Sequence, residues 1–176
     1  MKYILLCFSL LVFAGTSFSQ SAKPSNAEEE YMKEYNKRVT KDSLFGVYIP
    51  KDAPDAFRQL DKLIDDASKK KFKEYPEEKV KVFGLRSLGK WMTMNWSLYE
   101  GSRLVANLKS RGLYHPEDMA LFLVIGYYRT LNNLPLEEKE RIDEYQKKRH
   151  DAFLEEKKKR KVLSETIIKK PKPEKK

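Results

Sequence analysis

The chain has 176 residues, a formal net charge of +10 at pH 7 and 35% charged residues, and its length suits one domain with a single core. Its one cysteine, Cys7, lies in an apolar N-terminal segment that we expect to be cleaved, which excludes disulfides, thiolate metal sites and a cysteine nucleophile from the mature protein. The only histidines are His115 and His150, and no glycine-rich phosphate loop occurs, so we expect no metal and no cofactor.

The first residues have the layout of a secretory signal peptide. Lys2 precedes an apolar run from Tyr3 to Phe13, and small and polar residues follow as far as Gln20. A transmembrane helix needs roughly 20 apolar residues, and this run is far shorter. We therefore predict a signal peptide over residues 1–20, cleaved after Ser19 or Gln20. The mature chain is then expected in the periplasm or outside the cell, with no membrane span.

A lead segment and the start of the core domain follow. Residues 21–43 are predicted to form a flexible lead and a charged, peripheral helix. The core domain is predicted over residues 44–135 and begins with a short extended connection. Its first helix has Asp52 as N-cap and Pro54 in the first turn, and apolar residues then recur with helical spacing: Phe57, Leu60, Leu63, Ile64 and Ala67.

Two more helices are predicted before the centre of the domain. One begins at Pro76 and carries an apolar stripe as far as Tyr99, and Gly84 can interrupt it. Ser102 is the expected N-cap of the next, short helix, which Gly112 ends. Short helices joined by tight turns indicate a compact bundle.

The remainder of the chain is predicted to be a central helix, a long charged helix and a tail. Pro116 opens the most apolar helix, from Met119 to Tyr128, which should lie at the centre. Residues 136–168 are predicted to form a charged helix because acid–base pairs four residues apart recur in it, such as Glu137–Arg141 and Glu156–Arg160. Residues 169–176 are predicted to be a disordered basic tail. The predicted fold is all-α: a compact single-domain helical bundle with a long charged C-terminal helix and a disordered C-terminus.

Motifs spread over residues 47–133 resemble a bacterial family that is known only as a domain of unknown function. They are YIPKD (48–52) with DAF (55–57) and LDKL (60–63), LG.W and NW (88–96), GSRL (101–104), HP.DM (115–119) and Y.R.LN (127–132). Each motif alone is weak, whereas the combination is specific. The resemblance implies a domain assignment, and no activity, cofactor or partner comes with it.

Three residues come nearest to a catalytic set: His115, Asp118 and Arg103. A histidine beside carboxylates at the start of a helix can perform acid–base chemistry. A structural role explains the same residues, because Pro116 suits the first helical position and the carboxylates of Glu117 and Asp118 oppose the helix dipole. An enzyme built on these three residues is therefore the alternative to a binding protein.

Four aromatic residues are candidates for binding: Trp91, Trp96, Tyr99 and Tyr114. Aromatic faces bind peptides and glycans well, although core packing explains most aromatic residues of a bundle. Met92 and Trp96 share a helix face, whereas Trp91 points about 140° away from Trp96. One of the two tryptophans is therefore expected at the surface.

The positive charge of the chain is concentrated at its C-terminal end. Residues 147–176 hold 13 basic and 5 acidic residues. The run Lys157, Lys158, Lys159, Arg160 and Lys161 can bind an anionic surface by neutralising phosphates, and a solvated helix explains the same charges. We expect an exported, non-enzymatic domain that binds an unidentified macromolecule such as a protein. The alternatives are the enzyme above and an anion-binding protein that uses this run.

Overall fold

The computed structural model describes the backbone of residues 26–168 and the side chains of residues 26–161. The predicted signal peptide (1–20) and the predicted disordered tail (169–176) lie outside the described residues. In chain order the elements are α1 (Asn26–Val39), β1 (Ser43–Leu44), β2 (Val47–Tyr48), α2 (Ala53–Leu63), α3 (Asp66–Glu74), α4 (Glu77–Gly84), the π-helical turn η1 (Leu85–Gly89), α5 (Lys90–Asn95), α6 (Arg103–Ser110), α7 (Pro116–Leu131) and α8 (Glu138–Ile168). The predicted all-α bundle is confirmed.

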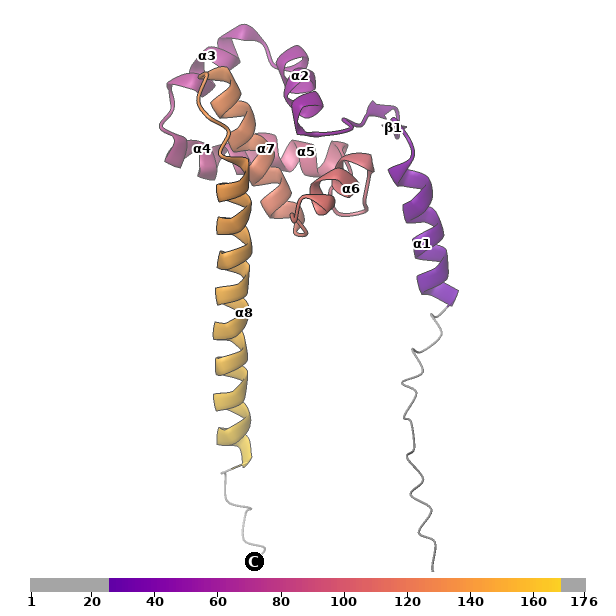
Figure 1. Ribbon diagram of the computed structural model, residues 1–176, viewed down its shortest axis with the longest axis vertical. Coiled ribbons are helices and arrows are strands. Elements are labelled where there is room, and N and C mark those ends of the chain that lie inside the picture. Colours follow the sequence, from indigo (N-terminus) through magenta and orange to yellow (C-terminus); the bar gives the residue numbers. More distant parts are fainter. Residues whose placement is uncertain (1–25, 169–176) are drawn as a thin grey trace, which may run out of the picture.

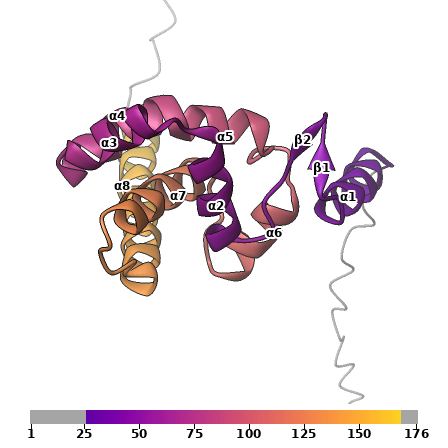
Figure 2. The same cartoon turned by 90° about the horizontal axis from the view of Figure 1, so that it is seen from above.

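Helix α7 is the centre of the bundle (Figures 1 and 2). From Met119 to Tyr128 every side chain is buried except that of Leu121, which is half-buried. Helices α2, α3, α4, α5 and α8 all contact it. A helix that is apolar on every side is stable only when neighbours cover every side. The prediction of a central helix is therefore confirmed.

The predicted caps are confirmed at the starts of α2 and α6. The Asp52 carboxylate accepts a hydrogen bond from the backbone N–H of Asp55 at 2.8 Å, and Pro54 lies in the first turn of α2. The Ser102 hydroxyl accepts the backbone N–H of Val105 in the same way. These local hydrogen bonds satisfy donors that a helix start leaves free, so they can be predicted from sequence alone.

Helices α4 and α5 form one continuous rod through η1, and the expected interruption at Gly84 does not occur. Within η1 the backbone N–H of Lys90 donates to the carbonyl of Leu85, five residues earlier. The wider turn accommodates one extra residue, so Met92 and Trp96 stay on the buried side of the rod. In a regular α-helix the extra residue would turn both side chains about 100° away from the core.

Helix α8 has a part that packs on the bundle and a part that leaves it. Ile142 and Tyr145 are buried against the body. After Tyr145 every described side chain is exposed, as the sparse apolar residues of this stretch suggested. Figure 1 shows the helix running away from the other helices. We call residues 146–161 the arm.

The ion pairs of α8 differ in part from the prediction. Glu156 and Arg160 are paired as expected. Glu137 and Arg141 are not paired: Arg141 is buried and donates hydrogen bonds to backbone carbonyls, one of them in α7, while Glu137 binds Arg129. Arg141 therefore attaches α8 to the bundle. Helical spacing alone does not reveal such a contact between helices.

The predicted extended connection before α2 contains a small antiparallel hairpin of β1 and β2, with Phe45 and Gly46 at its turn. The hairpin has two residues in each strand and leaves the all-α class unchanged.

Helix α1 has no buried residue, as expected for a peripheral helix. Its Arg38 donates hydrogen bonds to the backbone carbonyls of Glu100 and Gly101, which attach it to the segment before α6.

Candidate functional site

The candidate residues from the sequence do not form one site. Trp96 lies in the core, with 1% of its surface exposed. Trp91, Tyr99 and Tyr114 line three different surface depressions. His115 and Asp118 share the depression of Tyr114, and Arg103 lines none of the three.

An apolar depression of about 290 Å³ lies where the end of α2 meets η1 and α5. Leu63 is 61% exposed and Trp91 36% exposed, so the floor of this depression is open to solvent. Contiguous exposed apolar patches mark interaction sites more often than is expected by chance. We call it the Trp91 patch, and it is formed by Leu60, Leu63, Ile64, Leu88 and Trp91.

Trp96 holds Trp91 in place. The two rings meet edge to face, with their centroids 5.6 Å apart and their planes at 76°. One ring is buried and the other is at the surface, as the five-residue separation predicted. Because Trp96 is fixed in the core, Trp91 rests on a rigid neighbour and loses little freedom when a partner covers it.

The depression that holds His115 is smaller, about 160 Å³, and lies between α8 and the loop before α7. Arg149 of α8 donates two hydrogen bonds to the carboxylate of Asp118, at 2.8 and 2.9 Å. Among the described residues no hydrogen bond joins His115 to Asp118. His115 is the N-cap residue of α7, as its place before Pro116 suggested, although its side chain makes no cap hydrogen bond. The carboxylate is thus neutralised by arginine and does not orient the imidazole.

Arg103 serves a different part of the fold. Its Nε donates to the backbone carbonyl of Ile49 at 2.7 Å, and its guanidinium carbon lies 5.0 Å from the ring centroid of Tyr48. Helix α6, about 12 Å long, separates it from the loop before His115. The structure therefore brings His115 and Asp118 together but places Arg103 elsewhere, where it attaches the segment before α2 to α6.

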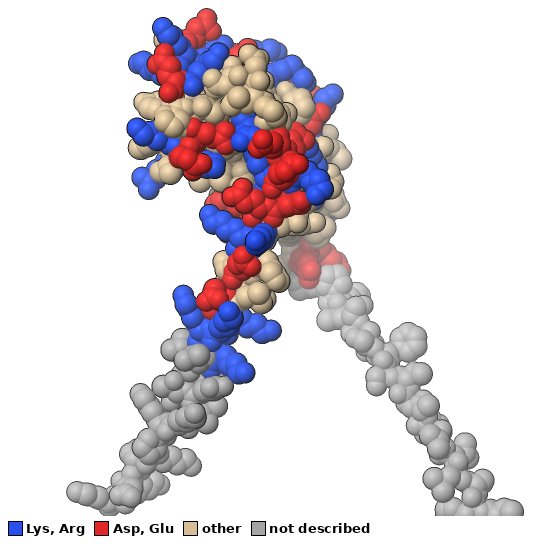
Figure 3. Space-filling view, turned by 60° about the vertical axis from the view of Figure 1, so that its left-hand side comes forward, with Lys and Arg blue, Asp and Glu red and all other residues tan. Residues whose placement is uncertain are grey.

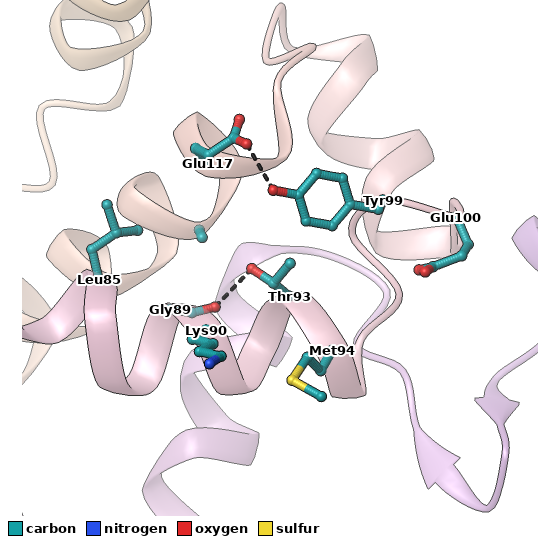
Figure 4. Close-up of a pocket in the computed structure, with 9 residues that line it drawn as sticks. Leu85, Gly89, Lys90, Thr93, Met94, Tyr99, Glu100 and Glu117 are labelled. Atoms are coloured by element: carbon teal, nitrogen blue, oxygen red, sulfur yellow. Dashed lines mark hydrogen bonds between the residues drawn. The ribbon is translucent and has the colours of Figure 1, made fainter.

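Tyr99 lines a third depression, of about 360 Å³, between η1, α5 and the start of α7 (Figure 4). Its hydroxyl donates to Oε1 of Glu117 at 2.7 Å. This hydrogen bond raises the pKa of Tyr99 and lowers the pKa of Glu117. On the wall formed by η1 and α5, the Thr93 hydroxyl donates to the carbonyl of Gly89, one turn earlier in the same rod. The phenol stays protonated and the carboxyl ionised at neutral pH, so neither group is poised for proton transfer.

A metal centre and a membrane-spanning helix are two other kinds of functional site. Within residues 26–161 no group of three or more histidine, cysteine, aspartate or glutamate side chains is arranged to hold a metal ion. None of the helices in the part of the chain that the structure describes is both long and apolar enough to cross a membrane.

Sequence reasoning missed Arg149 and the neighbours of Trp91. Arg149 binds Asp118, which lies 31 residues earlier in the chain. Nothing in the charged sequence around Arg149 distinguishes this arginine from the neighbouring lysines. Leu63 continues the apolar stripe of α2, yet it is the last residue of the helix and stays exposed, so the predicted stripe does not run on to Ala67 in one helix. A signal for this end was available: after Ile64, Asp65 is the N-cap of a new helix that begins at Asp66.

No match was found among curated proteins, and none among solved structures. Residues 49–131 match the family described as Domain of unknown function (DUF6794). This range agrees with the resemblance over residues 47–133. It runs from just before α2 to the end of α7, so it contains the Trp91 patch and leaves out α1 and α8. Over residues 49–131 the chain therefore matches a DUF6794 domain.

Proposed function

We propose that this protein binds another protein through the Trp91 patch and is not an enzyme. The observation that carries the proposal is an open depression, lined by apolar residues, that includes a tryptophan packed against the core. Protein interfaces concentrate their binding energy in a few such side chains, tryptophan above all, because these bury a large area at small entropic cost. The patch therefore has the properties of an interface centre.

The chemistry of the patch indicates its partner. Its centre is apolar, whereas exposed charged residues adjoin it in the sequence, Lys62 beside Leu63 and Asp65 beside Ile64. An apolar centre within a polar rim is the usual anatomy of a protein interface. A depression of about 290 Å³ accommodates one or two large apolar side chains. The partner we infer is an amphipathic segment of another protein that inserts such a side chain.

The roles of the catalytic candidates support the same conclusion. The Asp118 carboxylate is occupied by Arg149, and Arg103 is occupied by a backbone carbonyl and the Tyr48 ring. An acid–base site needs its members to face one reacting atom. Each of these side chains instead stabilises a contact between elements of the fold.

A selection from a random peptide library tests the proposal. Peptides are selected on the wild-type protein, and their affinities are then compared for wild type, Leu63→Glu and Leu134→Glu. Leu134 is the matched control because it is also an exposed leucine, 44% accessible, and lies outside the patch. We expect peptides with an apolar anchor residue. A charge inside the patch should weaken them at least about tenfold, while Leu134→Glu leaves their affinity unchanged.

Thermal melts of both variants should stay close to that of wild type, since both leucines are exposed. If the selection yields no binder, the Trp91 patch is not a protein-binding surface. Binders that Leu63→Glu and Leu134→Glu affect equally would lead to the same conclusion.

A further inference from the structure

The arm has a composition that the packing of the bundle does not explain. All of its described side chains are exposed, and Figure 3 shows lysine and arginine side chains gathered at the end of α8 that leaves the body. Gln146 and Arg149 at the start of the arm donate hydrogen bonds to Gly112 and Asp118 of the body. The helix beyond them gains little from the core, so apolar residues there have no folding role. Phe153 is nevertheless 61% exposed and Leu154 40% exposed within it.

The two large apolar residues of the arm share one face of the helix with Lys157, Lys161 and His150, while its other basic residues are spread around the helix. Lys157 follows Phe153 by four positions and Leu154 by three, so all three lie on the same side. Lys161 follows Lys157 by four positions, and His150 precedes Phe153 by three and Leu154 by four. We call these five residues the basic–apolar face.

The carboxylates of the arm lie on the other side. At about 100° per residue Asp151, Glu155 and Glu156 are each at least about 100° around the helix from Lys157. Two of them are also neutralised there: Glu155 binds Lys158 at 2.8 Å and Glu156 binds Arg160. Within the described arm, the face that carries Phe153, Leu154 and Lys157 therefore holds no carboxylate, although basic residues such as Lys159 also lie on other sides of the helix.

We propose that the basic–apolar face binds anionic lipid, with the helix lying in the plane of the membrane surface. Phe153 and Leu154 enter the boundary between headgroups and acyl chains, while Lys157 and Lys161 bind lipid phosphates on either side. A nucleic acid explains the lysines but offers no apolar environment for Leu154, which is why lipid is the better match. The five lysines among residues 169–176 add charge at the same end of the chain.

This site is independent of the Trp91 patch. The patch is formed by α2, η1 and α5, whereas the basic–apolar face lies on the part of α8 that leaves the bundle. Binding at one surface therefore leaves the other exposed, and the two proposals succeed or fail separately.

Vesicle sedimentation with the full chain tests the proposal. Vesicles of phosphatidylcholine with about one third phosphatidylglycerol are compared with pure phosphatidylcholine, for wild type, Lys157→Glu, Lys159→Glu and Phe153→Ser. Lys159 is the matched control because it is an exposed lysine two positions away, on the opposite side of the helix. All four proteins carry the same residues 1–20, so the differences among them report the arm.

We expect wild type to bind the anionic vesicles and to release them as the salt concentration rises. Lys157→Glu and Phe153→Ser should each weaken binding at least about fivefold, and Lys159→Glu less than about twofold. Equal losses from both lysine variants, with no loss from Phe153→Ser, would indicate general charge attraction and overturn the proposal. Tighter binding to duplex DNA with that same pattern would identify nucleic acid as the ligand. Failure of wild type to bind anionic vesicles at low salt would also overturn it.

Discussion

Single residues of the DUF6794 motifs hold neighbouring elements together. Asp52 caps α2, and Asp55 accepts a hydrogen bond from the hydroxyl of Tyr48 at 2.8 Å. Arg103, from the GSRL motif, donates to the carbonyl of Ile49 and so connects two motifs that lie 54 residues apart. The motifs therefore specify a fold. This explains why their pattern identified a domain and no chemistry.

The charge of Asp55 is part of this arrangement. Its side chain is buried, and burial alone would raise its pKa; hydrogen bonds from the Lys51 backbone, the Tyr48 hydroxyl and Arg58 outweigh burial and lower the pKa below the ordinary value of 3.8. A carboxyl whose pKa is lower in the folded state stabilises the fold above its unfolded pKa. That stabilisation is lost as the pH falls through the folded-state pKa.

Asp55→Asn should therefore lower the free energy of unfolding by about 1–3 kcal/mol at pH 7, because the amide cannot accept all three hydrogen bonds. The difference from wild type should begin to shrink below about pH 4, where the Asp55 carboxyl of the unfolded wild-type chain takes up a proton before that of the folded chain does. Urea unfolding at pH 7 and pH 3 measures both effects. Asp151→Asn, in the exposed arm, is the control and should change stability by less than about 0.5 kcal/mol. A loss of equal size at both pH values would contradict this role.

Capping residues could be predicted from sequence, and exposed apolar residues could not. Asp52, Ser102 and Gly112 were identified because a cap depends on the backbone within a few residues. The spacing placed Leu63 on the apolar face of its helix, but spacing shows only which helix face a residue occupies. Whether another helix covers that face at that position along the helix depends on the tertiary arrangement.

Among the elements, the π turn η1 decides which side chains of the rod reach the surface. With it, Met92 and Trp96 face the core, while Leu88 and Trp91 line the Trp91 patch. The sequence could not reveal η1, because the apolar positions before and after it each fit a regular helix. Only their packing against α7 requires the extra residue.

Removing that residue tests the role of η1. Deleting the exposed Ser87 places Gly84 and Met92 seven positions apart, two turns of a regular helix, so the buried face stays continuous. We expect a loss of less than about 1 kcal/mol of stability. Inserting one alanine after Ser87 should instead turn Met92 and Trp96 out of the core and cost at least about 4 kcal/mol. Thermal melts followed by circular dichroism compare the two, and equal damage would show that η1 does not set the register.

Helix α8 shows the same limit of prediction. Its length and one of its ion pairs, Glu156–Arg160, followed from local spacing. The point where it leaves the body did not, because that point depends on Arg141 and Tyr145 packing against the bundle. The direction in which the arm points was likewise invisible in the sequence.

At the scale of the whole molecule, the two proposed binding surfaces lie on different parts of the chain. The Trp91 patch belongs to the DUF6794 domain, over residues 49–131, whereas the arm lies outside it. The two proposals together describe a protein that binds a partner through its body and a lipid surface through its arm. Such a protein would hold its partner near a membrane.

The bundle itself could be predicted from sequence, because apolar periodicity and helix caps are local and numerous. The dispersal of the candidate aromatic residues could not. Trp91, Tyr99 and Tyr114 are all aromatic and lie within a short stretch of chain, yet they line three depressions. Their separation follows from how the helices around α7 are arranged.

Acrylamide quenching of tryptophan fluorescence, with and without a peptide from the selection, tests the central claim that a partner covers Trp91. The chain has two tryptophans, so Trp91→Phe leaves only the buried Trp96 and serves as the reference. We predict stronger quenching in wild type than in Trp91→Phe. A saturating peptide should reduce wild-type quenching to the level of that variant. Equal quenching of the two proteins, or wild-type quenching that the peptide leaves unchanged, would contradict the claim.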